Sequence, residues 1–278
     1  MTFGARLAKA VAERGPFCVG IDPHAALLRD WGYDDDVAGL ERFALGAVAA
    51  VAPHCSVVKP QSAFYERFGS RGVAVLERVV AESRAAGALV LLDVKRGDIG
   101  STSQAYADAY LDPASPLSSD AITVSPYLGF GSLTPFVETA RQHDAGLFVL
   151  GATSNPEGPE VQTALTTASY GGKTVTATML DHLRELNDGA EPTGSFGAVV
   201  GATISDTTGL DFAFNGPILA PGYGEQGGTT ADIARIFGAG AANVLAASSR
   251  GVLRQGPDAT AMRDEVLRAN DELRGLLA

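Results

Sequence analysis

The chain has 278 residues, of which 46% are apolar and 33 are glycine, a composition that excludes a disordered chain and favours a large core with many tight turns. The formal net charge of −11 argues against nucleic acid or an anionic membrane as a partner, because both select clustered Lys and Arg. Any anionic ligand must therefore be held by a few local cations and by backbone amides.

The opening segment, TFGARLAKAVAERG, is predicted to form an amphipathic helix over about residues 2–14. It contains Glu13 and lacks a continuous apolar stretch, so it does not look like a signal peptide. No run approaches the roughly 18 apolar residues of a membrane span. Cys18 and Cys55 lie in or next to apolar runs without metal-ligand spacing, so reduced buried thiols and a cytoplasmic location are expected.

The rest of the chain alternates short apolar runs with helical sequence. The runs have the composition of buried parallel strands, and they read FCVGID, SVVKPQSAF, ALVLLDVK, AITVSPY, GLFVLGATS, FGAVVGAT, PILAPGYG and ANVLAAS. This alternation predicts a (β/α)8 barrel in a single domain over residues 1–278. A doubly wound open sheet is the competing layout, but GIDPHAALL after the first strand lacks its Gly-rich fingerprint.

An insert and a C-terminal helix complete the expected fold. A longer insert lies after the fifth strand at about residues 155–195, and its Gly/Pro-rich first half is a candidate mobile lid. Its second half, TMLDHLRELND, is predicted to be helical. The last helix, DEVLRANDELRGLL, has apolar residues at helical spacing, namely Val266, Ala269, Leu273 and Leu276.

The third strand continues into DVKRGDIGST, the most unusual stretch of the chain. Alternate side chains of a strand share a face, so Asp93 and Lys95 are expected to point the same way, with Asp98 in the following loop. Buried charge is costly unless it is paired or has a function. A salt bridge closing the strand is the structural alternative, but the second acid and the Gly-rich helix entry favour a functional site. Ser101 or Thr102 is expected to cap the next helix.

Polar residues at other strand ends extend this site. Active residues of such barrels lie at the carboxyl ends of the strands, so we expect convergence of Asp22, Lys59, Asp93, Lys95 and Ser125. Lys59 interrupts an apolar run, and it either extends to the strand end or faces a ligand.

The loops after the seventh and eighth strands predict a phosphate site. APGYGEQGG offers free backbone amides and contains Gln226, and SSRG places Arg250 one strand later. Amides, a helix N-terminus and an arginine commonly bind phosphate at this position of a barrel. The Gly-rich loop alone is equally explained by a tight turn, but the arginine favours phosphate.

Together these motifs resemble the orotidine 5′-phosphate decarboxylase family, particularly its longer bacterial branch (type 2). The segments GIDP, VKPQSAFYE, DVKRGDIGST, VSPYLG, APGYGEQGG and SSRG follow the family's order over essentially the whole chain. D-x-K-x-x-D with the following Ile and Thr is the most specific part. The resemblance implies decarboxylation of orotidine 5′-monophosphate to uridine 5′-monophosphate in de novo pyrimidine biosynthesis. It further implies a homodimer with shared active sites and no cofactor or metal.

The resemblance also implies roles for the residues around the reacting carbon. Asp22 and Lys59 would hold the ribose hydroxyls, and Lys59 would tie that network to Asp93. Asp93 would lie against the substrate carboxylate, and Lys95 would lie beside the pyrimidine carbon that loses it. Ser125 would contact the pyrimidine edge.

The remaining implied contacts come from a second subunit and from the phosphate loops. Three residues would reach into the neighbouring subunit's site, namely Asp98, Ile99 and Thr102. Gln226 and Arg250 would bind the phosphate, and Gly222 and Tyr223 would line that loop. This branch differs from the shorter one in its loops after strands five and seven, so which loop closes over the ligand stays open.

The chemistry itself explains why such residues are needed. Loss of carbon dioxide from an sp² ring carbon leaves an in-plane carbanion that no adjacent π system absorbs, so the protein must stabilise the charge. Carboxylates near a lysine favour its ionised form, and such a cation can stabilise the carbanion and then protonate it. Repulsion between Asp93 and the substrate carboxylate is relieved on decarboxylation, and phosphate contacts supply remote binding energy.

Three alternative functions have to be compared with this one. A sister enzyme with the same D-x-K-x-x-D strand acts on sugar phosphates through a Mg²⁺-stabilised enediolate, and a chelator would inactivate it. A non-catalytic barrel that binds phosphate ligands would bind nucleotide without turnover. A Schiff-base aldolase is disfavoured, because both candidate lysines have carboxylate neighbours that oppose the neutral amine.

Overall fold

Eight parallel strands close into a barrel in the order of the sequence in the computed structural model of the chain, which describes residues 1–275. The strands are β1 (Phe17–Ile21), β2 (Val57–Pro60), β3 (Leu89–Arg96), β4 (Ala121–Val124), β5 (Gly146–Ala152), β6 (Phe196–Val200), β7 (Ile218–Pro221) and β8 (Val244–Ser248). Each pairs with its neighbours and β8 pairs with β1, so the predicted (β/α)8 barrel is confirmed and the open sheet is wrong.

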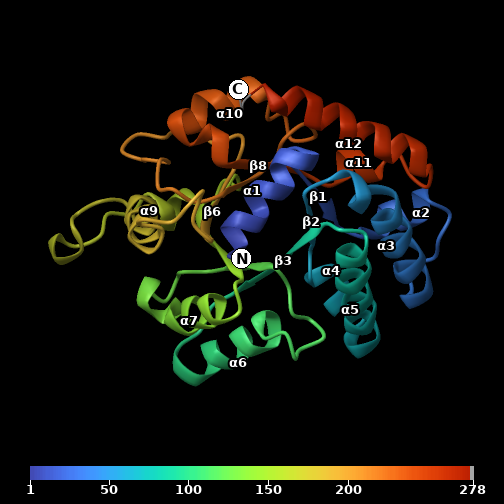
Figure 1. The fold of residues 1–278 in the computed structure, drawn as a ribbon, viewed down its shortest axis with the longest axis horizontal. Helices are drawn as coiled ribbons and strands as arrows, with labels where there is room; N and C mark the ends of the chain where they lie inside the picture. The colour runs from blue at the N-terminus through green and yellow to red at the C-terminus, as the bar shows by residue number, and fades with distance from the viewer. Residues whose placement is uncertain (276–278) are drawn as a thin grey trace.

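Helices surround this barrel in an outer ring, as Figure 1 shows. The longer ones are α3 (Val37–Val51), α5 (Gly69–Ala85), α6 (Gly100–Leu111), α7 (Thr134–Gln142), α9 (Val175–Leu186), α10 (Thr230–Phe237) and α12 (Ala259–Arg274). Short helices follow strands at α2 (Ala25–Asp30), α4 (Ala63–Glu66), α8 (Pro159–Gln162) and α11 (Arg250–Leu253). The predicted last helix corresponds to α12, and its Leu276 lies outside the described residues.

The buried side chains form two layers, one inside the barrel and one between the barrel and the helices. The inner layer takes residues from every strand, and they are Cys18, Val57, Leu91, Ala121, Phe148, Val199, Leu219, Leu245 and Ala247. Helix α1 (Phe3–Arg14) lies across the amino-terminal end of the barrel, where Phe3 and Leu7 join this layer (Figure 1). The interior is therefore packed, and a ligand site has to lie at the opposite end.

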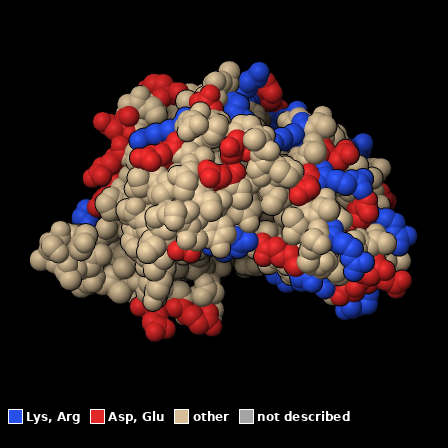
Figure 2. Space-filling view, turned by 90° about the horizontal axis from the view of Figure 1, so that it is seen from below, with Lys and Arg blue, Asp and Glu red and all other residues tan. Residues whose placement is uncertain are grey.

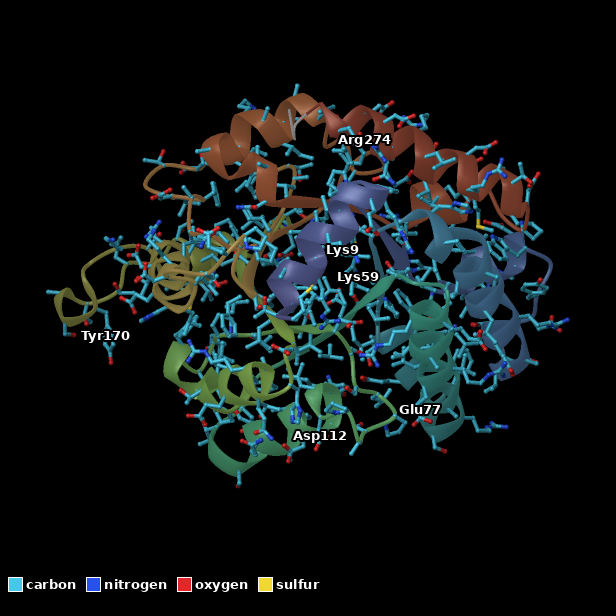
Figure 3. The ribbon with its side chains drawn as sticks, viewed as in Figure 1. Lys9, Lys59, Glu77, Asp112, Tyr170 and Arg274 are labelled. Carbon is cyan, nitrogen blue, oxygen red and sulfur yellow. The ribbon has the colours of Figure 1, made fainter. Side chains whose placement is uncertain are left out.

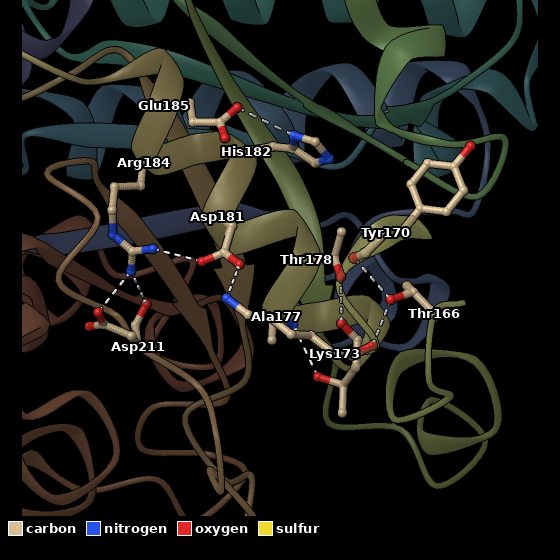
Figure 4. A network of polar contacts seen from close by, with 11 residues as sticks. Thr166, Tyr170, Lys173, Ala177, Thr178, Asp181, His182, Arg184, Glu185 and Asp211 are labelled. Carbon is tan, nitrogen blue, oxygen red and sulfur yellow. Dashed lines mark hydrogen bonds and ion pairs between the residues drawn. The ribbon is translucent and has the colours of Figure 1, made fainter. Parts of the chain in front are cut away.

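The insert after β5 forms a lobe that stands out from the ring, with Tyr170 pointing outward (Figure 3). A bridge between Leu165 and Thr174 closes a small antiparallel loop. Lys173 at its base donates to Asp181 of α9 at 2.5 Å, and Arg184 links Asp181 to Asp211 (Figure 4). These contacts fix the base of the lobe on α9.

Charged side chains are unevenly spread over the flank that Figure 2 shows. Basic and acidic groups alternate on its right-hand part. Ion pairs such as Arg78 of α5 with Glu41 of α3, and Arg67 after α4 with Asp35 of the loop before α3, link neighbouring elements. Much of the left-hand part is uncharged. This flank therefore presents mixed charge and no extended basic surface among the described residues.

Candidate active site

The carboxyl end of β3 departs from regular strand geometry. From Leu92 to Arg96 the strand advances four residues while β4 advances two, from Ile122 to Val124, so β3 bulges here. Within the bulge Lys95 adopts a φ of 46°, a left-handed conformation that is uncommon for a residue other than glycine. Its amide donates to the hydroxyl of Thr123 at 2.9 Å. Such backbone outliers concentrate at functional sites.

Asp93 is the centre of a group of four residues that we call the β3 network: Lys59, Asp93, Lys95 and Thr123. The Asp93 carboxylate accepts from Lys59 Nζ at 3.0 Å, from Lys95 Nζ at 2.6 Å and from Thr123 Oγ1 at 2.7 Å. Asp93 and Lys59 are buried, whereas the Lys95 side chain is 45% exposed. One lysine therefore anchors the carboxylate from inside and the other presents its ammonium to solvent.

The charges of the β3 network stabilise each other. Burial raises the pKa of Asp93, but Lys59 and Lys95 outweigh it and hold this pKa well below its ordinary value. Burial lowers the pKa of Lys59, but Asp93 and Asp22 more than offset it, so the pKa lies above its ordinary value. Asp93 and Lys59 consequently form an ion pair at neutral pH.

A cavity of about 390 Å³, which we call the mouth cavity, opens at the carboxyl ends of β1, β2, β7 and β8. It brings together six residues predicted from the sequence, namely Asp22, Lys59, Gly222, Tyr223, Gln226 and Arg250. Lys59 lies within the ring of strands in Figure 3 and joins this cavity to the β3 network. Asp22 Oδ1 is buried there and has no hydrogen-bond partner among the described residues.

The Gly-rich loop after β7 turns tightly at the edge of the mouth cavity. Gly222 has a φ of 101°, a left-handed conformation that favours glycine, and its Cα faces the side chain of Gln226. Tyr223 also borders the cavity, and its hydroxyl donates to Glu272 of α12 at 2.9 Å.

Three of the predicted residues lie outside the site of their own chain. Asp98 accepts from the amide of Ile99 at 2.8 Å, Ile99 is 62% exposed and Thr102 is exposed at the start of α6. Within residues 1–275, no hydrogen bond joins any of them to the β3 network or the mouth cavity. The expected capping of α6 by Ser101 or Thr102 is wrong, since Ile99 occupies the N-cap position.

Ser125 lies at the end of β4 beside the β3 loop rather than in the mouth cavity. Its amide donates to the carbonyl of Arg96 at 2.8 Å, and any side chain at Gly97 would overlap its carbonyl oxygen. Ser125 also lines a second, more apolar cavity of about 810 Å³, which lies between the loop after β4 and the insert. The insert therefore borders this second cavity and not the mouth cavity.

Sequence reasoning missed three residues of the site. Gln61 lies two residues after Lys59, and its Oε1 accepts from Lys95 Nζ at 3.4 Å. Thr123 completes the β3 network, and His24 lines the mouth cavity. The alternation of β2 could have indicated Gln61, because residues two apart share a face of a strand.

The described residues contain no group of three or more His, Cys, Asp or Glu side chains placed to hold a metal ion. Likewise, none of the helices described here is long and apolar enough to cross a membrane.

Comparison with known proteins identifies the family. Residues 15–264 match the family described as orotidine 5′-phosphate decarboxylase / HUMPS. The chain belongs to this family. The resemblance seen in the motifs is therefore confirmed.

Individual relatives are similar over nearly the whole chain. Orotidine 5′-phosphate decarboxylase of a Nocardioides species is 73% identical over 273 residues, which cover 98% of both chains. The enzyme of that name from Streptomyces coelicolor is 62% identical, over 98% of this chain and 97% of the relative. The crystal structure of a putative orotidine 5′-phosphate decarboxylase from Streptomyces avermitilis superposes with a TM-score of 0.96 at 62% identity. That match covers 99% of this chain and 96% of the other.

Proposed function

We propose that the chain catalyses the decarboxylation of orotidine 5′-monophosphate to uridine 5′-monophosphate, as a carboxy-lyase of pyrimidine biosynthesis that needs no metal or cofactor. The observation that carries this proposal is the β3 network, a buried carboxylate held between two lysines beside the mouth cavity. The name shared by relatives of 73% and 62% identity favours this activity over the sugar-phosphate chemistry of the sister enzyme.

In the proposed mechanism, Lys95 supplies both charge and proton. The C–C bond to the substrate carboxylate breaks, carbon dioxide leaves, and the bonding electron pair stays on the ring carbon. The Lys95 ammonium, fixed at 2.6 Å from Asp93, stabilises this pair and then transfers a proton to the carbon. Solvent returns the proton to the lysine, whose side chain is 45% exposed.

Asp93 has two roles in this proposal. It holds the Lys95 ammonium in position, and it repels the substrate carboxylate until carbon dioxide forms. Lys59 and Thr123 fix Asp93 from behind, so the carboxylate cannot turn away from the substrate. Preorganised charges of this kind lower the barrier without rearranging during the reaction.

The mouth cavity would hold the ribose and the phosphate. Asp22 presents a buried oxygen that lacks a partner among the described residues, which suits a ribose hydroxyl donor. Gln226 and Arg250 border the same cavity from the loops after β7 and β8, and they would bind the phosphate. Ser125 would contact the pyrimidine edge from β4.

We further propose a cytoplasmic homodimer in which each site is completed by the partner. The support is the placement of Asp98, Ile99 and Thr102, which lie away from their own site although they belong to the family's most specific motif. Tyr127 and Leu128, in the loop after β4, are 77% and 53% exposed and add an apolar surface. Sedimentation of the purified chain as a monomer would contradict this part of the proposal.

The test of the activity is direct. Orotidine 5′-monophosphate is offered to the purified protein with a chelator present, and the fall in its absorbance is followed. We expect turnover that the chelator leaves unchanged. Nucleotide binding without turnover would instead support the non-catalytic barrel, and turnover abolished by the chelator would support metal-dependent chemistry.

A further inference from the structure

His24 occupies a place in the mouth cavity that the proposed function leaves unassigned. It lies three residues after the end of β1, and its amide donates to the carbonyl of Asp22 at 2.8 Å. The imidazole meets the ring of Phe64 edge to face, with the ring centres 4.2 Å apart and the planes at 62°. Phe64 belongs to α4, which follows β2, so two neighbouring strands hold the imidazole at the edge of the cavity.

The imidazole is placed by packing and not by hydrogen bonds. Neither ring nitrogen of His24 makes a hydrogen bond to any residue between positions 1 and 275. The side chain is partly buried and borders the same cavity as Arg250 and Gln226. Its ring nitrogens are therefore without partners among the described residues, while the ring itself packs on Phe64 at the border of the cavity.

The charges around His24 come from three elements. Asp22 lies in its own loop, Arg250 begins α11, and Arg67 follows α4. Burial lowers the pKa of His24, and Arg250 and Arg67 lower it further against the opposing effect of Asp22. Lys59 and Glu225 also border the cavity. The imidazole of the free protein is consequently neutral at neutral pH.

We propose that His24 is a phosphate-binding residue that acts beside Arg250 and takes up a proton when the nucleotide binds. Arg250 lines the cavity, and among residues 1–275 it forms no ion pair with a carboxylate that would compensate its charge. A phosphate dianion placed there neutralises that positive field and favours the imidazolium, which then donates a charge-assisted hydrogen bond. The inference rests on the proposed function in one respect, namely that the ligand is a nucleoside monophosphate.

The direction of the pH effect follows from this coupling. The bound state holds one more proton than the free state between the low pKa of His24 in the free protein and its higher pKa in the complex. Affinity for the nucleotide therefore falls as pH rises through that window. The effect is separable from titration of the ligand at about pH 7.5, where a phosphate monoester with a second pKa of about 6 is already a dianion.

The experiment is calorimetric titration of the whole protein with uridine 5′-monophosphate in two buffers of different ionisation enthalpy, which counts the protons exchanged. We expect the natural protein to take up a fraction of a proton, and His24→Gln to take up none and bind about tenfold more weakly. His24→Asn also keeps a donor without titrating, so it should behave as His24→Gln does, whereas His24→Ala lacks the donor and should bind more weakly still without proton uptake. Uridine, which lacks phosphate, should show no uptake with any variant.

His143→Gln serves as the matched control, since His143 lies beyond α7 at the amino-terminal end of the barrel. It should bind and take up protons as the natural protein does. Equal proton uptake and affinity in His24→Gln, or nucleotide binding without proton exchange in the natural protein, would overturn the inference. Failure of the proposed function appears separately, as absence of decarboxylation in the absorbance assay.

Discussion

The β3 network and the mouth cavity are adjacent, yet their polar groups are arranged in opposite ways. In the β3 network every charge has a partner within the chain, because Asp93 accepts from both lysines and from Thr123. In the mouth cavity, Asp22 Oδ1 has no partner among the described residues, and Arg250 forms no ion pair there. The difference separates a preorganised chemical centre from a binding surface that a ligand has to complete.

The largest effect should come from removing the exposed ammonium of the β3 network. We expect Lys95→Ala to lower kcat by about a thousandfold or more, because it removes both the electrostatic stabilisation and the proton donor. Circular dichroism and thermal unfolding should match the natural protein, since the side chain is 45% exposed. Substantial remaining turnover by the folded variant would contradict the role of Lys95.

Mixing inactive variants tests whether the β3 network is complete in one copy of the chain. Lys95→Ala and Asp98→Ala subunits are refolded together and assayed. Random mixing makes half of the dimers hybrid, and each hybrid holds one intact site of two, so about a quarter of full activity should return. Recovery of no activity, with hybrid dimers detected by native mass measurement, would place Asp98 outside the partner's site.

Changes in the mouth cavity should affect KM more than kcat. Arg250→Gln should raise KM by about ten- to a hundredfold, because a charge-assisted contact to phosphate is lost. The effect on kcat should be much smaller than that of Lys95→Ala. Arg263→Gln, an exposed arginine of α12 paired with Asp264, is the control and should leave both parameters unchanged.

The pH dependence of the free energy of unfolding tests the pairing of Asp93 in the β3 network. The pKa of Asp93 is lower in the folded protein than in the unfolded chain, so its contribution to the free energy of unfolding is present above the ordinary carboxyl pKa and is lost as pH falls. We expect Asp93→Asn to destabilise the fold by about 3 kcal/mol at neutral pH, since it leaves Lys59 buried without its partner. The difference from the natural protein should shrink towards about pH 3, as measured by urea unfolding.

Asp30→Asn, which changes an exposed acid of α2, provides the comparison for the acid series. Its stability curve should run parallel to that of the natural protein. A loss for Asp93→Asn that stayed constant down to pH 3 would show that the effect is steric and not electrostatic.

The smallest effect concerns the hydroxyl behind the carboxylate. Thr123→Val removes the donor to Asp93 and the acceptor for the Lys95 amide, and we expect kcat/KM to fall about tenfold. Thr123→Ser keeps both contacts and should retain most of the activity. If valine and serine variants behave alike, Thr123 contributes packing alone.

The barrel and six residues of the mouth cavity were predictable, because strand composition and the position of polar residues at strand ends are local properties of the sequence. Gln61 and His24 of the same cavity were not predicted. The bulge of β3 was not predictable, since it depends on how β3 pairs with β4. The left-handed conformation of Lys95 and the role of Thr123 follow from this bulge, so they were not predictable either. The hydrogen bond from the Tyr223 hydroxyl to Glu272 was also not predicted, because its partner lies 49 residues away.

Among residues 1–275, helix α1 closes the amino-terminal end of the barrel and leaves the carboxyl-terminal end open. Phe3 sits against Gly146 and Phe148 across the amino-terminal end, and the inner layer fills the space above it. Reactant, carbon dioxide and nucleotide product must then pass through the same opening. Any segment that covers this opening during turnover would also retain the carbon dioxide, so the carbon dioxide can leave only when the site reopens.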